Sequence, residues 1–205
     1  MSEATPLTLA DISDQRAYER ERDEFRRHVI QVKKLRRVSI GPVITVTFEN
    51  RLTMRFQVQE MARAERMFSD QQIQTELDVY NRLLPAPGEL SATLFLELTN
   101  DALLREWLPK LVGIEGAVEF RIGAAGSEDV VRSVPEAEHA SHLTRETVTS
   151  AVHYIRFRFT EAQMVAFADG PVVLAVSHPQ YPDGASGTEL SPAARAELLG
   201  DLRGD

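Results

Sequence analysis

Polar side chains that could bind a small anion recur at alternate positions of several segments with strand-like patterns. Within 52–59, apolar and polar residues alternate, so one face of a strand would be buried and the other would carry amides and a guanidinium. With hydroxyls and a second guanidinium from neighbouring segments, the candidate ligand-binding residues are Arg55, Gln57, Gln59, Thr93, Tyr154 and Arg156, beside Thr45 and Thr47. Arginines can bind a carboxylate or phosphate bidentately while amides and hydroxyls orient it. The same alternation is typical of an antiparallel sheet whose outer face is in water, and that alternative stays open.

Carboxylates near this face could supply a general acid or base. Glu60 follows the alternating segment directly and joins the candidate ligand-binding residues, while Glu49 and Glu65 lie nearby without a defined orientation. A second stretch rich in donor atoms contains His139 and His142 among glutamates. It lacks the regular pattern that would fix ligand geometry, so we predict a solvated acidic loop and no metal site.

The polar face depends on two strands that must pair. The segment 43–48 alternates apolar residues with threonine, and residues 49–51 form a short connection to 52–59. This spacing predicts an antiparallel hairpin. Over 60–68 the apolar period becomes that of a helix, so the second strand is expected to lead directly into a helix.

The remaining segments predict a mixed fold. A helix over 14–37 carries a narrow apolar stripe, which indicates packing along one seam, against the sheet or against a second copy of itself. Capping patterns at Ser69, Thr160 and Ser191 predict three further helices. Strands are predicted over 91–98, 117–122, 152–159 and 172–177. The expected fold class is α+β, with a mainly antiparallel sheet of about five to seven strands, helices on one face and a long N-terminal helix.

The length of 205 residues favours one domain. We place it over 14–200, between a flexible N-terminus over 1–13 and a frayed tail over 201–205. The stretch around 123–150 is expected to be a mobile loop that encloses one short edge strand at Val130, Val131 and Val134.

Composition excludes several classes of protein. The chain contains no cysteine, which excludes disulfides, thiolate ligation of zinc or iron–sulfur clusters by this chain, and a cysteine nucleophile. A formal net charge of −8 argues against nonspecific binding to nucleic acid, and the basic run over 33–37 indicates the cationic end of a helix. No signal-peptide pattern and no apolar run of membrane-spanning length is found, so we expect a cytoplasmic protein with no nucleic-acid or membrane partner.

Several short motifs occur together along the chain. They are Phe48-Glu49-Asn50-Arg51, Phe56-Gln57-Val58-Gln59-Glu60-Met61 followed by 63–66, Pro87-Gly88-Glu89-Leu90-Ser91-Ala92-Thr93, and stretches at 36–38, 80–81, 111–115, 154–157 and 178–179. With these motifs the chain resembles, from Leu9 to the terminal helix, a family of uncharacterised bacterial proteins classed as a domain of unknown function. Members of that family are similar in being encoded near rubrerythrin-type diiron proteins and cysteine-rich iron–sulfur oxidoreductases. The resemblance therefore implies a redox or oxidative-stress setting, and it assigns no catalytic residue.

These considerations lead to one leading hypothesis and two alternatives. We predict a cytoplasmic binding or accessory protein, without a cofactor of its own, that serves an iron-dependent redox system with a diiron or iron–sulfur protein as partner. The first alternative is an enzyme for a small anionic substrate, which Arg55 and Arg156 would bind while Glu60 acts as acid–base group. The second alternative is a structural scaffold that forms a homodimer through the N-terminal helix.

Overall fold

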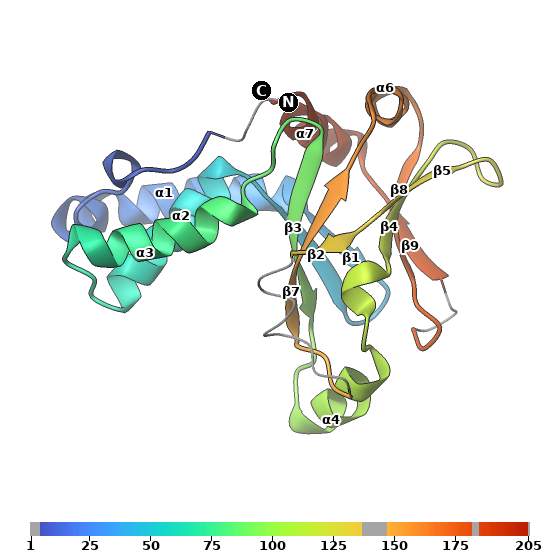
Figure 1. Ribbon diagram of the computed structural model, residues 1–205, viewed down its shortest axis with the longest axis horizontal. Helices are drawn as coiled ribbons and strands as arrows, with labels where there is room; N and C mark the ends of the chain where they lie inside the picture. The colour runs from blue at the N-terminus through green and yellow to red at the C-terminus, as the bar shows by residue number, and fades with distance from the viewer. Residues whose placement is uncertain (1–4, 137–146, 182–184, 205) are drawn as a thin grey trace.

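The strands of the protein form two antiparallel sheets that pack against each other (Figure 1). The computed structural model describes residues 5–136, 147–181 and 185–204. Sheet A has the strand order β1-β2-β3-β7-β6, and sheet B has the order β5-β4-β8-β9. The strand bounds are β1 Arg37–Ile40, β2 Ile44–Glu49, β3 Glu89–Leu96, β4 Val118–Ile122, β5 Asp129–Arg132, β6 Val134–Pro135, β7 Val152–Arg158, β8 Val172–Ser177 and β9 Ala185–Glu189. The predicted α+β class is confirmed, although the strands are divided between two sheets instead of gathered in one.

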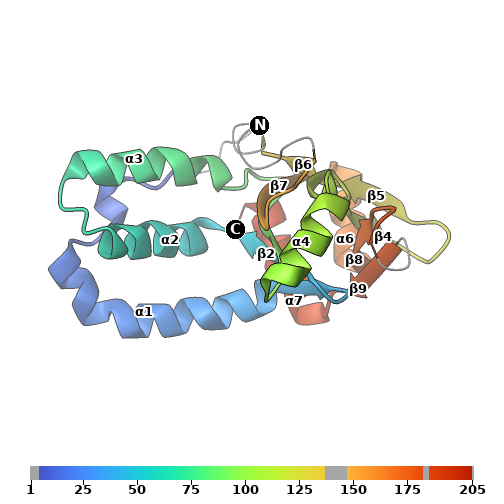
Figure 2. The same ribbon diagram turned by 90° about the horizontal axis from the view of Figure 1, so that it is seen from below.

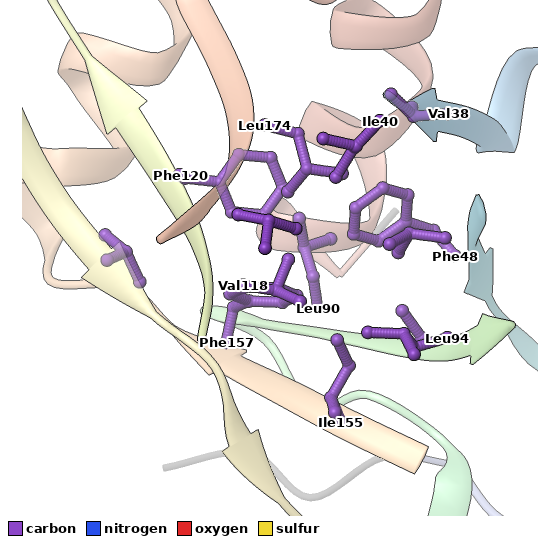
Figure 3. Packing of buried hydrophobic residues seen from close by; sticks show 14 of the residues in the cluster. Val38, Ile40, Phe48, Leu90, Leu94, Val118, Phe120, Ile155, Phe157 and Leu174 are labelled. Atoms are coloured by element: carbon purple, nitrogen blue, oxygen red, sulfur yellow. The ribbon is translucent and has the colours of Figure 1, made fainter. Parts of the chain in front are cut away.

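Apolar side chains fill the space between the two sheets. Phe48 of β2, Phe120 of β4 and Phe157 of β7 are fully buried, and the ring centroids of Phe120 and Phe157 are 4.8 Å apart. Figure 3 shows these rings among aliphatic side chains from both sheets. Because successive strand residues point to opposite faces, the neighbours of Phe48 and Phe157 point to the reverse of sheet A.

Three helices project from the side of sheet A that is away from sheet B (Figures 1 and 2). They are α1 Gln15–Arg36, α2 Arg51–Ala64 and α3 Asp70–Tyr80. A second apolar cluster joins α2 and α3 to the chain before α1, and it consists of Leu7, Met54, Val58, Leu77, Leu83 and Leu84. The ring centroids of Phe25 on α1 and Phe56 on α2 are 5.7 Å apart, so the apolar stripe of α1 packs within the chain.

Two of the remaining helices begin at predicted capping residues. The bounds are η1 Leu9–Asp11, η2 Asn81–Leu83, α4 Asp101–Lys110, η3 Ile114–Gly116, α6 Glu161–Asp169 and α7 Pro192–Arg203. The side chains of Ser69, Thr160 and Ser191 each accept a backbone N–H of the first helical turn, which confirms the three predicted caps. Of the described residues, none belongs to a helix that is both long and apolar enough to cross a membrane.

The prediction of a strand over 52–59 is wrong, because this segment is the first part of α2. The Asn50 side chain accepts the N–H of Thr53 at 3.0 Å, and the Thr53 hydroxyl accepts the N–H of Asn50 at 2.9 Å, which closes a capping box. Met54, Val58 and Ala62 then recur every four residues and are buried. The predicted hairpin is wrong as well, since β2 pairs with β1 and β3.

Packing begins well before α1. Leu7 is 2% exposed, and the Asn81 side chain accepts its N–H at 2.7 Å and donates to its carbonyl at 2.9 Å. The chain therefore already contacts the rest of the fold at Leu7, before residue 14, where the domain was predicted to begin.

Two predictions near the C-terminal half have different outcomes. The one short edge strand predicted at Val130, Val131 and Val134 is two strands, β5 at the edge of sheet B and β6 at the edge of sheet A. Mobility of the surrounding stretch stays a prediction, and α7 extends into the tail as far as Arg203.

Candidate functional site

Two of the predicted ligand-binding residues on α2 instead bind the segment before α1. The Arg55 guanidinium donates to the carbonyl of Asp11 at 2.7 Å and lies 4.9 Å from the ring centroid of Phe25. The amide of Gln59 accepts the N–H of Ser13 at 3.0 Å and donates to its carbonyl at 2.9 Å. Because Gln59 is 2% exposed and its amide bonds to a main chain on both sides, its role is to attach this segment to α2.

Glu60, the predicted acid–base group, is held in an ion pair. Its carboxylate accepts two hydrogen bonds from the Arg22 guanidinium, both at 2.8 Å, and one from the buried hydroxyl of Tyr18 at 2.7 Å. The bonds from Arg22 lower the pKa of Glu60, while burial and the bond to Glu60 raise that of Tyr18. These contacts join α1 to α2.

Arg156 is also engaged in contacts that hold the fold together. Its guanidinium donates to Glu89 at 3.0 Å, to the carbonyl of Leu84 at 3.2 Å and to the carbonyl of Arg82. Arg55 and Arg156 therefore bind different parts of the chain, and the structure does not bring them together as a pair for an anion.

A different group of polar residues meets on the reverse of sheet A, and we call it the polar cluster: Glu49, Gln57, Tyr80, Thr93 and Tyr154. The register aligns Thr93 of β3 with Tyr154 of β7, and Glu49 is the last residue of β2. Phe48 points into the core between the sheets, so Glu49 points to the opposite face (Figure 3). The predicted site residues Gln57, Thr93 and Tyr154 thus come together, although Gln57 reaches the cluster from a helix.

The floor of the polar cluster is buried. Glu49 and Thr93 are each 5% exposed, and the Thr93 hydroxyl donates to Glu49 Oε1 at 2.7 Å. Thr45, Thr47 and Ser91 on the same face are buried too, so an outer sheet face in water is wrong for these strands. In the part of the chain that the structure describes, Glu49 Oε2 is buried without a hydrogen-bond partner, which leaves one carboxylate oxygen of the cluster unsatisfied.

The rim of the polar cluster is half-buried. Tyr80 and Tyr154 come from α3 and β7, and Gln57 forms a side-chain hydrogen bond with Tyr80. Burial raises the pKa of both tyrosines, and the negative charge of Glu49 raises it further in each case. Glu49 therefore lies within electrostatic reach of two phenol groups that border solvent.

Arg36 binds the main chain at Glu49, next to the polar cluster. Its side chain is fully buried, and its guanidinium donates to the carbonyl of Phe48 at 3.0 Å and to that of Glu49 at 3.3 Å. On its other side it binds Glu197 at 2.8 Å and Asp201, both from α7. Burial raises the pKa of Asp201 despite the opposing charge of Arg36.

Sequence reasoning did not identify Tyr80 or Arg36 as site residues. Both lie in stretches that carry the family resemblance, at 36–38 and 80–81, and that was the available signal. Periodicity alone places Tyr80 on a helix stripe and gives Arg36 no partner, because both contacts depend on residues far apart in sequence.

Other possible sites have less support. His139 and His142 lie outside the described residues, and among residues 5–136, 147–181 and 185–204 no group of three or more side chains is placed to hold a metal ion. A groove of about 410 Å³ lies between η1 and the helices α1, α2 and α3. Its buried polar groups, Gln59 and the Tyr18 hydroxyl, are already used by Ser13 and Glu60, so neither of these two groups is free to anchor a ligand.

Comparison with known families gives a match over most of the chain. Residues 6–202 match the model of a family described as "Protein of unknown function (DUF3501)". The chain belongs to this family. This chain is similar to a solved structure of a protein of unknown function from Burkholderia pseudomallei, with 35% sequence identity and a TM-score of 0.86. The match covers 97% of this chain and 100% of that one. No curated protein matches the chain. Membership in the family, which the sequence motifs indicated, is thereby established, and it carries no assigned activity.

Proposed function

We propose that this protein is a binding protein that holds a small ligand at the polar cluster, with Glu49 as the principal anchor. The observation that carries the proposal is the buried, unpartnered oxygen Oε2 of Glu49. Leaving a buried polar atom without a partner costs about 1–3 kcal/mol, and more for a charged group. A ligand that donates a hydrogen bond to Oε2 would offset this cost, which is a reason for the cost to persist in the free protein.

The burial of the cluster residues is consistent with such a site. Tyr80, Tyr154 and Gln57 are half-buried and border solvent, while Glu49 and Thr93 lie beneath them. The floor belongs to strands of sheet A, which the aromatic core supports on its other face. A rigid floor under a partly open rim is an arrangement common in ligand sites.

The ligand proposed here donates hydrogen bonds, in contrast to the small anion expected from the sequence. Arg55 and Arg156 are both used by main-chain carbonyls, and Arg156 also by Glu89. The groups that the cluster offers are a carboxylate, hydroxyls and an amide. An enzyme that binds a small anion through these two arginines has no supporting contact here.

The biological setting of the binding protein is proposed from the resemblance. We propose that it acts in the cytoplasm as an accessory protein of an iron-dependent redox system, with a diiron or iron–sulfur protein as partner. A homodimer through α1 is the remaining possibility for self-association, and it would use the exposed residues Ile30 and Leu35, since the stripe that contains Tyr18 and Val29 is buried within the chain. Copurification of the tagged protein under reducing and oxidising conditions tests the partner, and sedimentation analysis tests the dimer.

Native mass spectrometry tests the binding function. Wild-type protein purified without denaturant is expected to retain a small molecule that Glu49→Gln loses, because the amide has no charge to hold it. Glu106→Gln is the matched control, since Glu106 is exposed on α4 and pairs only with Lys110 among the described residues. Absence of any bound molecule in the wild type, or retention of the same molecule by Glu49→Gln, would contradict the proposal.

A further inference from the structure

Among the described residues, the carboxylates that act on the polar cluster have no ion-pair partner. Besides Glu49, the carboxylates of Glu65 and Glu76 act on Tyr80, and all three raise its pKa. Among the described residues, none of these three carboxylates forms an ion pair with a lysine, arginine or histidine. The pKa of Glu76 is raised by burial and by the like charge of Glu65, which is the result expected where no cation relieves the repulsion.

Elsewhere the same chain pairs its shielded carboxylates with guanidinium groups. The pairs are Glu60 with Arg22, Glu89 with Arg156 and Arg158, Glu119 with Arg121 and Arg132, and Asp201 with Arg36. Each of these carboxylates is one-quarter exposed or less. Glu49 is as well shielded, but among the described residues its carboxylate accepts a hydrogen bond from one hydroxyl on one oxygen and none on the other. Glu115 is the other described carboxylate with a buried oxygen that accepts no hydrogen bond, and its charge acts on His153. Among the described residues, Glu49 therefore differs from the paired carboxylates in that no cation binds its carboxylate.

We infer that the ligand of the polar cluster is a small organic cation of the alkylammonium or alkylguanidinium class. This inference rests on the proposed binding function and adds the chemical class of the ligand. An N–H of the cation would donate to Glu49 Oε2, and its positive charge would supply the compensation that the described residues do not.

An organic cation fits the site better than a metal ion. No three described His, Cys, Asp or Glu side chains are close enough to ligate one ion, so Glu49, Glu65 and Glu76 do not form a metal site. Two half-buried tyrosines at the rim supply aromatic surface, which attracts organic cations and covers an alkyl chain. Glu65 and Glu76 lie further out, where their field would raise the local concentration of cations.

Titration of the full-length protein with matched probes tests the class of ligand. The probes are n-butylammonium and n-butylguanidinium as cations, n-butanol as the neutral chain of equal length, n-butyrate as the anion and Mg²⁺ as the inorganic cation. Calorimetry measures affinity, and the tyrosine near-ultraviolet difference spectrum reports whether the probe reaches Tyr80 and Tyr154. The variants are Glu49→Gln, Glu76→Gln as a milder change on the solvent side of the site, and Glu106→Gln as the control with the same loss of charge on α4.

We expect at least one butyl cation to bind the wild type at millimolar concentration or below and to perturb the tyrosine spectrum. Its affinity is expected to fall at least about tenfold in Glu49→Gln, because a hydrogen bond to a charged group is lost, and severalfold in Glu76→Gln. Glu106→Gln is expected to bind like the wild type, and butanol and butyrate are expected not to bind.

The possible outcomes distinguish a wrong class of ligand from a wrong binding function. Binding of butanol that depends on Glu49, without binding of the cations, would overturn the cationic class and leave the proposed function standing. Binding of Mg²⁺ instead of the butyl cations, or equal affinity of the cations for wild type and both site variants, would overturn the organic-cation inference. If no probe binds and native mass spectrometry finds no retained molecule, the proposed function fails together with the inference.

Discussion

Replacement of Arg36 by methionine should destabilise the protein far more than the same replacement at the adjacent Arg37. The buried Arg36 guanidinium binds the carbonyls of Phe48 and Glu49 and the carboxylate of Asp201. Removing one partner of a buried ion pair costs about 3–5 kcal/mol, since the remaining charge and carbonyls lose their partners. With an m value of about 2 kcal/mol/M in urea, a loss of about 4 kcal/mol lowers the unfolding midpoint by about 2 M.

Arg37 provides the matched control, because its ion pair with Glu97 is 55% and 44% exposed on the two sides. Arg37→Met is therefore expected to change the free energy of unfolding by no more than about 1 kcal/mol. Arg36→Lys keeps the charge but loses the planar guanidinium, so its free energy of unfolding should lie between those of the two methionine variants. Urea denaturation followed by circular dichroism measures all three. A loss below about 1 kcal/mol in Arg36→Met, or an equal loss at Arg37, would refute the assignment of Arg36 as the support behind Glu49.

Three further predictions concern the helical layer. Asn50→Ala should cost about 1 kcal/mol, because α2 loses the cap that bonds to Thr53, and equal stability in thermal melts would contradict the capping box. Glu60→Gln should lower the free energy of unfolding at neutral pH, because the ion pair with Arg22 is lost. Since the pKa of Glu60 is lowered in the folded state, the advantage of the wild type should be present above the ordinary glutamate pKa of about 4.3 and vanish as the pH falls through the folded-state pKa. A difference in stability that does not depend on pH would count against this ion pair. Arg66→Gly should stabilise the protein by about 1 kcal/mol, because residue 66 has a φ of 55° after the end of α2; a loss of stability in chemical denaturation would show that the arginine side chain compensates for this backbone strain.

Local sequence signals were sufficient for most helices and for several strands. Caps such as Ser69, Thr160 and Ser191 satisfy the first N–H groups of a helix whatever lies elsewhere in the chain, so they can be recognised from a few neighbouring residues. The strand β7 was predicted for the same reason, since its alternation over 152–159 reflects one buried face.

In the segment 52–59, the alternation of apolar and polar residues wrongly predicted a strand. Leu52, Met54, Phe56 and Val58 alternate, but Met54 and Val58 are also four residues apart and continue to Ala62. The signals that decide between the two patterns are the cap at Asn50 and the absence of Gly or Pro through the segment. The helix then buries Met54 and Val58 against α3 and the residues before α1.

The candidate site was only partly accessible from sequence. Thr93 and Tyr154 could be predicted to share a strand face, because the sheet alternation is local. The contact of Glu49 with Thr93 and the proximity of Tyr80 depend on the pairing of β2 with β3 and on the docking of α3, which join distant segments. The absence of a partner for Glu49 Oε2 is likewise a property of the packed chain.

The stability of Glu49→Gln without ligand tests most directly whether this carboxylate serves binding or folding. The amide keeps an oxygen that can accept from Thr93 and replaces the charged Oε2 by a neutral NH2 group, which costs less to bury than a charge although it has no described partner either. The account predicts that dialysed Glu49→Gln unfolds at an equal or higher urea concentration than the wild type, with a gain of up to about 2 kcal/mol, while Glu106→Gln stays unchanged. A loss of more than about 1 kcal/mol in Glu49→Gln would mean that the charge supports the fold, and the reason for expecting a ligand there would be gone.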